Sequence, residues 1–280
     1  MSEPAALEGT KIQTSPVPLD RRGEGLSAIG TLAMAALQAA FGLLLLLIWQ
    51  LASGTLVDPF FVSSPSAVIA RLWAWTRDGS IFIHVWATVY ATFLGFVIGA
   101  VLGVFGGIWL GLSPFFSRLL SPYIWAFNAL PKVALAPLLI LWFGLGIQSK
   151  VALSAVLVVF LVFVNTFSGV REVDQDLIDG VRLMKAKRHQ ILTKVILPSA
   201  TSWIFVGLKT ALPYALIGVI IGEMIASNKG LGYLVQRAGS EFDTAGAFAA
   251  LAVIALIAVV LNELVQAIQT RLERWKIVSR

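Results

Sequence analysis

Three ionisable side chains, Lys132, Lys209 and Glu223, lie inside long apolar runs of this 280-residue sequence. A charge inside a hydrocarbon layer is costly, so it usually marks a polar path or reaches out to the surface. Lys132 lies near the middle of its run, where its positive charge suits an anionic solute, and Asn128 is a candidate for the same path or for a hydrogen bond between helices. Lys209 lies near one end of its run and can snorkel. Glu223 either lines a gate or holds the end of its run through hydrogen bonds.

The sequence carries no pattern of a catalytic centre. It contains no GxxxxGK[ST] phosphate loop, no HExxH motif and no GxSxG motif. It has no cysteine, and its two histidines, His84 and His189, are far apart. We therefore expect a protein that is not an enzyme, with no catalytic residue, no metal site and no cofactor of its own.

The composition is that of an integral membrane protein. Hydrophobic residues make up 58% of the chain and charged residues 13%, and the mean hydropathy is +0.86. A hydrocarbon core needs about 20 apolar residues in a helix. Six runs reach that length and predict an all-α protein with six transmembrane helices, at residues 32–51, 85–110, 119–143, 151–170, 200–226 and 245–268.

The basic residues are distributed unevenly around these runs. Most of the 21 Lys and Arg residues fall before the first run, between the fourth and fifth runs and after the sixth, which all lie on one side of a six-span topology. The positive-inside rule then places both termini and the 171–199 segment in the cytoplasm. The charge is explained by orientation and contact with the lipid bilayer, so we expect no nucleic-acid partner. Residues 1–28 are expected to form a disordered cytoplasmic tail, and residues 29–280 the transmembrane domain.

Small residues recur at every fourth position of the second run. The helix-packing residues expected from this ribbon are Gly95, Gly99, Gly103 and Gly107, and they allow another helix of the same subunit or of a partner to approach closely. Pro131, Pro137 and Pro213 lie within the third and fifth runs and predict kinks there.

Two further segments are too polar to span. Residues 64–79 begin with a Ser-Pro helix start and carry two tryptophans. They therefore predict a short helix that lies on the non-cytoplasmic surface of the membrane. Residues 227–243 predict a short helix or a re-entrant piece on the same side. Plain loops are the alternative for both segments.

The segment from Leu177 to Pro198 interrupts the apolar sequence with a basic, amphipathic pattern. Its first apolar set recurs at helical spacing and consists of Leu177, Ile178, Val181 and Met184, while Asp176, Asp179, Arg182 and Lys185 point elsewhere. A second apolar set follows, and the pattern predicts a stop at Pro198. Such a helix lies on the bilayer or presents its apolar face to a groove on a soluble partner.

This segment resembles the EAA loop of ABC importer permeases, a pattern of Glu-Ala-Ala, three residues, Gly and a later hydrophobic-Leu-Pro. Asp179, Gly180 and Val181 take the Glu-Ala-Ala places, Lys185 departs from the glycine, and Ile196, Leu197 and Pro198 form the end. The stretches LPKVALAPLLILWFGLG (residues 130–146) and GEMIASNKGLGYLV (residues 222–235) are similar to the nitrate, sulfonate and taurine branch of that family. The similarity extends from about residue 64 to the C terminus.

The resemblance implies a type I ABC importer permease of the bacterial inner membrane, with its core at about residues 80–270. It also implies a second, often identical permease subunit, two cytoplasmic subunits that bind ATP and Mg, and a periplasmic solute-binding protein. A coupling helix between the fourth and fifth spans would contact the ATPases through residues carried over from the pattern: Asp176, Leu177, Asp179, Gly180, Val181, Met184 and Lys185, with Leu197 and Pro198 ending the loop.

The expected solute is a small organic or inorganic anion such as a sulfonate, taurine or nitrate. One alternative is an uncharged or aromatic nutrient, such as a thiamine-pyrimidine precursor, carried by the same fold. Another is an ATP-independent channel or carrier whose basic loop binds lipid, although a carrier would be expected to show an internal repeat, and the sequence shows none.

Overall fold

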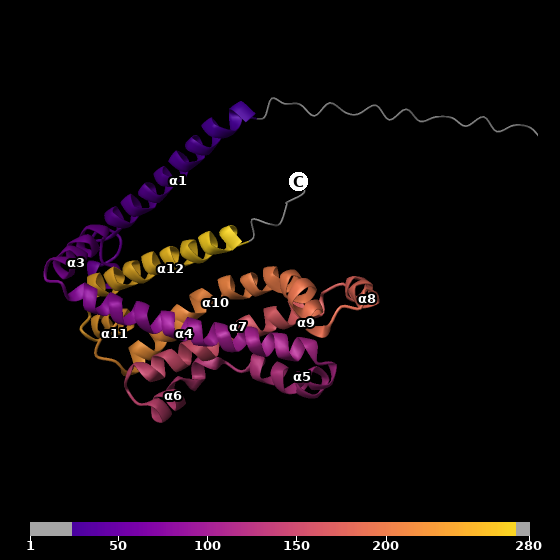
Figure 1. Ribbon diagram of the computed structural model, residues 1–280. Helices are drawn as coiled ribbons and strands as arrows, with labels where there is room; N and C mark the ends of the chain where they lie inside the picture. Colours follow the sequence, from indigo (N-terminus) through magenta and orange to yellow (C-terminus); the bar gives the residue numbers. More distant parts are fainter. Residues whose placement is uncertain (1–23, 273–280) are drawn as a thin grey trace, which may run out of the picture. The chain divides into compact units, whose positions relative to one another are not determined.

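The computed structural model describes residues 24–272, so most of the expected N-terminal tail lies outside the described residues. The chain divides into two units, Met1–Ala52 and Ser53–Arg280, of which residues 24–52 and 53–272 are described. In the first unit, α1 (Glu24–Ala52) is a single long helix. The named elements of the second unit are also helices (Figure 1): α2 (Pro59–Val62), α3 (Pro65–Arg77), α4 (Ser80–Leu112), α5 (Pro114–Ala129), η2 (Lys132–Leu135), α6 (Ala136–Phe143), α7 (Ile147–Arg171), α8 (Gln175–Leu183), α9 (Arg188–Ile191), η3 (Leu192–Ile196), α10 (Leu197–Ala226), α11 (Leu231–Ser240) and α12 (Thr244–Leu272).

The prediction of six spans agrees with the helices when the third span is counted as a bent pair. Five stretches are long and apolar enough to cross a membrane: Ala33–Ala52, Ser80–Leu112, Ile147–Arg171, Arg188–Ala226 and Thr244–Arg271. The sixth consists of α5 and the η2–α6 segment, which are bent by 85° relative to each other. Pro131 lies at this break, Pro137 in the first turn of α6, and Pro213 inside the continuous helix α10. The third span is therefore broken at Pro131, because proline lacks the N–H group that would continue the helix.

Helices α4, α7 and α10 form the core of the second unit. The buried residues Ala100, Val158, Val162, Ala211 and Ala215 form one apolar cluster among the three helices. The small-residue ribbon of α4 lies against α7 of the same chain. A methyl group at Gly103 would lie 2.8 Å from both the Val159 carbonyl oxygen and Val162 Cβ, and one at Gly107 would lie 2.6 Å from Thr166 Cβ. The two helix backbones are thus close enough that side chains on this face of α4 would separate them.

The second unit has two distinct ends, visible in Figure 1. At one end, which we call the α8 end, the buried residues Val170, Val173, Ile178, Ile191, Ile196 and Ala200 form an apolar cluster that joins α7, α8, α9, η3 and α10. At the other, the α11 end, Ile81, Leu231, Leu234 and Ala250 join α4, α11 and α12. Because α4 contributes Ile108 to the first cluster and Ile81 to the second, it runs from one end to the other.

The two short segments expected to be too polar to span are helical. Ser64 is the N-cap of α3, where its hydroxyl accepts a hydrogen bond from the Ala67 N–H at 3.3 Å. Arg71 of α3 forms an ion pair with Asp243 at 2.8 Å, just before α12 begins. The helix α11 packs on α10 and α12, so both short helices lie at the same end of the unit.

The close approach of α4 and α7 predicts that Gly103→Leu is strongly destabilising. A leucine side chain there meets backbone atoms of α7 that cannot rotate away, so we expect a loss of about 3 kcal/mol of stability. The measurement is thermal unfolding of the detergent-extracted protein. Gly42→Leu in α1 is the matched control, because nothing lies within 4 Å of that position. Equal midpoints for the two variants would contradict the close-packing argument.

Candidate coupling segment and solute pathway

The helix α8 is anchored on one face and exposed on the other. The Asp174 carboxylate caps its first turn by accepting a hydrogen bond from the Asp176 N–H at 2.8 Å. Ile178 is buried and Val181 packs on the same apolar cluster, whereas Leu177, Leu183 and Met184 are 56%, 86% and 82% exposed. Within the apolar set expected from the sequence, this chain therefore covers Ile178 and Val181 and leaves Leu177 and Met184 exposed. The neighbouring helices of this chain take up Ile178 and Val181, and a different set remains free.

The end of α8 retains the geometry that a glycine would provide at the Lys185 position. Lys185 has φ +58°, in the left-handed region. Its N–H donates to the Arg182 carbonyl at 2.8 Å, and the Ala186 N–H donates to the Val181 carbonyl at 3.3 Å. These two bonds define a Schellman motif, and Val181 and Ala186 pack on the same apolar cluster, as is usual for that motif. The exposed residues at the tip of α8 are thus held by a defined turn.

The predicted stop at Pro198 is wrong. Arg188 to Ala226 form one continuous helical stretch in which η3 is a π-helical turn and Pro198 lies in the first turn of α10. Proline is tolerated at such a position because the wider turn before it relaxes the demand for its missing N–H group. Leu197 and Pro198 consequently join the α8–α9 segment directly to the fifth span.

The two candidate pathway residues of the third span line one cavity. A cavity of about 270 Å³ lies beside η2, α7 and α10, and Asn128, Lys132, Phe160 and Tyr214 are among its lining residues. The Lys132 ammonium group donates to the Asn128 carbonyl at 2.9 Å and lies 4.9 Å from the centre of the Phe160 ring. The segment after the break at Pro131 therefore places a cation at one cavity with an aromatic ring of α7 and one of α10.

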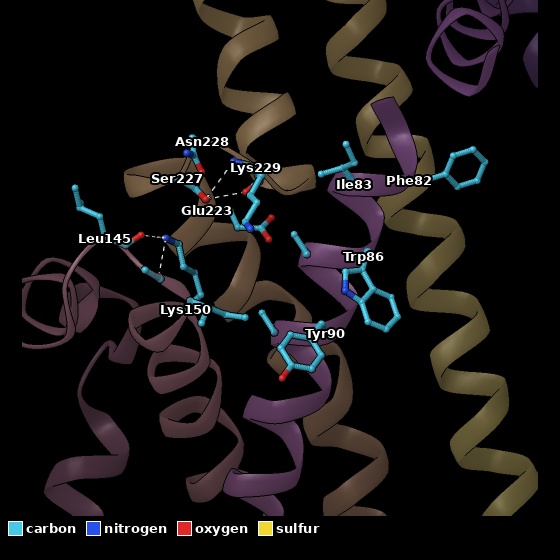
Figure 2. A pocket seen from close by; sticks show the side chains of 14 residues that line it. Phe82, Ile83, Trp86, Tyr90, Leu145, Lys150, Glu223, Ser227, Asn228 and Lys229 are labelled. Carbon is cyan, nitrogen blue, oxygen red and sulfur yellow. Dashed lines mark hydrogen bonds between the residues drawn. The ribbon is translucent and has the colours of Figure 1, made fainter. Parts of the chain in front are cut away.

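Glu223 lies elsewhere, in a larger cavity at the α11 end (Figure 2). This cavity has a volume of about 710 Å³, and Trp86 and Tyr90 of α4 form an aromatic wall with their rings stacked 5.9 Å apart. Glu223 is only 3% exposed. Figure 2 shows Glu223 and Lys150 on neighbouring elements of the same cavity, with Lys229 above them.

The buried Glu223 carboxylate holds the start of α11. Its oxygens accept hydrogen bonds from the Thr88 hydroxyl and the Gly232 N–H, each at 2.9 Å. The Thr88 hydroxyl in turn accepts from the Leu231 N–H at 2.8 Å, and His84 Nδ1 accepts from the Gly230 N–H at 3.0 Å. Three successive backbone donors are thus satisfied by side chains of α4 and α10. Of the two roles expected for Glu223, the hydrogen-bonded one is present.

Lys150 donates hydrogen bonds to backbone carbonyl groups at the ends of other helices, whereas Glu223 accepts them from backbone N–H groups. Lys150 is 4% exposed, and its ammonium group donates to the carbonyl oxygens of Leu145, Gly146 and Ala226. Ala226 is the last residue of α10, and the other two carbonyls follow the end of α6. A cation is favourable there because helix C-termini leave unpaired carbonyl groups with partial negative charge.

The sequence interpretation missed His84, Thr88 and Lys150 as structural polar residues of this end. Lys150 lies just before the expected run 151–170, but it is a buried residue of α7, which begins at Ile147. Thr88 lies on the same side of α4 as the small-residue ribbon. It is uncharged, so no sequence signal singles it out. In the described residues, no group of three or more His, Cys, Asp or Glu side chains is arranged to hold a metal ion.

Comparison with known proteins gives the class of this arrangement. The fold is shared with the inward-facing MetNI methionine ABC transporter, with a TM-score of 0.59 and 22% identity over 69% of this chain and 94% of that one. Residues 95–278 match the family described as "Binding-protein-dependent transport system inner membrane component". The fold is that of a type I ABC importer permease, with the helix α8 between its fourth and fifth spans.

Several permeases with assigned names are similar over most of their length. The riboflavin transport system permease protein RibX of Chloroflexus aurantiacus is 37% identical over 84% of this chain and 88% of its own. The taurine permease TauC of Escherichia coli is 33% identical over 89% of each chain, and the putative aliphatic sulfonates permease SsuC of Bacillus subtilis is 32% identical over 82% and 83%. This chain belongs to the family of inner-membrane components of binding-protein-dependent transport systems. It is a multi-pass permease subunit of an ABC importer, which works with ATP-binding subunits and a periplasmic binding protein.

The hydrogen bonds of Thr88 predict a local effect of Thr88→Val. Valine keeps the volume of threonine but leaves the Leu231 N–H and a carboxylate oxygen of Glu223 buried without this partner, at a cost of about 3 kcal/mol. We expect faster hydrogen–deuterium exchange of the amides at the start of α11. Thr92→Val is the matched control, because the Thr92 hydroxyl bonds only to the Thr88 carbonyl of its own helix. The same exchange in both variants would show that Thr88 does not hold α11.

Proposed function

We propose that two copies of this permease form the solute pathway, with two ATP-binding subunits at the α8 end and the binding protein at the α11 end. The α8 end would then be cytoplasmic. Its exposed basic residues, among them Arg182, Lys185, Lys187 and Arg188, support this orientation, since Lys and Arg are enriched in cytoplasmic segments. Both termini would lie on that side. ATP and Mg would be bound by the partner subunits.

One side of α8 is packed on the spans and its tip is exposed, and this observation carries the coupling proposal. Leu183 and Met184 are large apolar side chains that project from the end of a helix fixed to the fifth span. Exposed apolar side chains next to basic ones suit a groove on a soluble partner, the helix-in-groove mode of recognition. Movement of the ATPases would reach the spans through Ile178 and Val181, which connect α8 to the cluster of α7 and α10.

A pair of aspartate substitutions separates docking from folding. Leu183→Asp should leave thermal unfolding nearly unchanged, because the side chain is exposed, but it should abolish copurification of the ATPase and solute uptake. Val181→Asp should instead lower the stability of the permease itself by about 2 kcal/mol, because it places a carboxylate against an apolar cluster. Copurification and uptake at wild-type levels with Leu183→Asp would refute docking at this face.

For the solute, we propose a small organic anion such as a sulfonate. Lys132 supports this proposal, because its ammonium group lines a cavity within the bundle and forms no ion pair with any described residue. A fixed cation inside a membrane lowers the barrier for a negative solute and raises it for a positive one. The relatives named for taurine and aliphatic sulfonates are consistent with that charge.

The second candidate is a planar aromatic nutrient. Phe160 and Tyr214 line the same cavity as Lys132, and the rings of Trp86 and Tyr90 line the cavity at the α11 end. Aromatic walls suit an aromatic ring through stacking. The relative named for riboflavin supports this candidate.

Lys132→Met distinguishes the two solutes. If the cargo is an anion, removal of the positive charge should lower its uptake about tenfold, while the stimulation of ATPase activity by the binding protein persists. A neutral aromatic cargo should be affected little. Lys209→Met is the control, because Lys209 hydrogen-bonds to Gln266 at 3.0 Å instead of lining that cavity. Undiminished anion uptake by Lys132→Met would remove this residue from the pathway.

A further inference from the structure

A polar cleft of about 420 Å³ lies between α5 and α7 at the α8 end of the unit. The polar residues that line it are Ser117, Arg118 and Ser121 of α5, Ser168 and Arg171 of α7, and Glu172 directly after α7. None of them belongs to the exposed tip of α8 or to the cavity beside Lys132. Two arginines and three hydroxyl groups from separate helices thus meet at one opening.

The arginines of this cleft are not neutralised by the described chain. Arg71, Arg182 and Arg237 each form an ion pair with a carboxylate. Neither Arg118 nor Arg171 has such a partner among the described residues, and Glu172 forms no ion pair with either. Two guanidinium groups beside one carboxylate leave an excess positive charge, which complements a singly charged anion.

The donors of the cleft are partly fixed in position. The Arg171 guanidinium lies 5.9 Å from the centre of the Phe167 ring, which also lines the cleft, so its N–H groups remain available at the edge. Ser117 is 8% exposed, and it lines the cleft beside Arg118. Arginine and serine together are typical of sites for phosphate oxygens, because the guanidinium group binds two of them at once.

The cleft lies at the end of the spans, and the Phe167 ring lines it beside the polar groups. Arg171 is the last residue of α7, and Arg118 lies in the second turn of α5, so both are at the level expected for lipid headgroups. A ligand that places a phosphate among these donors, at the level of the headgroups and beside the Phe167 ring, has the chemistry of a phospholipid.

We propose that this cleft binds the phosphate group of an anionic phospholipid. Its assignment to the cytoplasmic leaflet rests on the orientation proposed above, where acidic lipids attract basic clefts between helices. The bound headgroup bridges α5 and α7 beside Asp174, the residue that caps α8. The lipid therefore stiffens the base of the helix proposed to receive the ATPase, and anionic lipid content regulates the transporter at that point.

The test is a lipid titration of the purified permease–ATPase complex by native mass spectrometry. Phosphatidylglycerol is compared with phosphatidylcholine of the same acyl chains. We expect phosphatidylglycerol to bind more tightly, and Arg118→Gln and Arg171→Gln each to weaken it about fivefold. Arg188→Gln is the matched control, because it removes an exposed charge at the same end but outside the cleft. It should leave the preference unchanged.

Two further measurements keep the test decisive. Ser121→Leu fills the cleft without a change of charge and should also weaken phosphatidylglycerol binding. This variant covers the case that the double variant Arg118→Gln/Arg171→Gln fails to fold. Competition with millimolar inorganic phosphate separates a lipid from a free oxyanion. Binding that phosphate displaces, without any preference for phosphatidylglycerol, would overturn the lipid assignment.

Unchanged lipid preference in the double variant Arg118→Gln/Arg171→Gln would likewise overturn the proposal. If that variant lost the ATPase but kept its lipid preference, the arginines would belong to the protein interface instead. Lipid binding is measured without transport, so failure of the coupling or solute proposals would leave this result unaffected.

Discussion

The close contact between α4 and α7 is the constraint on which the rest of the second unit depends. Lipid surrounds the spans, so helix association relies on close packing more than on hydrophobic burial. Glycines at every fourth position of α4 let the backbone of α7 approach, and α10 completes the core around the buried residues Val158 and Val162. Both functional ends are attached to these three helices, because α8 packs beside α7 and α10 and α11 is held by α4 and α10.

Polar side chains hold the helices together at the α11 end of the second unit, as close packing against glycine does in its middle. At the α11 end, Glu223 and Thr88 satisfy backbone donors at the start of one helix, and Lys150 satisfies carbonyl groups at the ends of two others. Buried charges are stable in such surroundings only when hydrogen bonds replace the lost water. The hydrogen bonds at this end thus form a connected network beside an aromatic cavity. In the proposed orientation, the solute would reach the permease from the binding protein at this cavity.

The α8 end is built differently, since its helix is joined to the core by apolar contacts and leaves its tip free. Ile178 and Val181 attach α8 to the spans, while Leu183 and Met184 face away from them. The π-helical turn before Pro198 makes α9 and α10 one continuous stretch. A displacement of α8 can reach the fifth span through the apolar contacts of Ile178 and Val181 and through the short turn at residues 184–187, which leads into this continuous stretch.

The sequence by itself determined the class of protein and the positions of its elements. Apolar length fixed the spans, four-residue spacing fixed the ribbon, and the short pattern around Asp179 and Pro198 indicated the family, because each depends on local chemistry or helical periodicity. The tertiary structure alone decided which apolar residues of α8 are free, that the third span is broken by 85°, and that Glu223 pairs with Thr88, which lies 135 residues away. Periodicity shows that a helix has two faces, but what covers each face depends on neighbours that are distant in the chain.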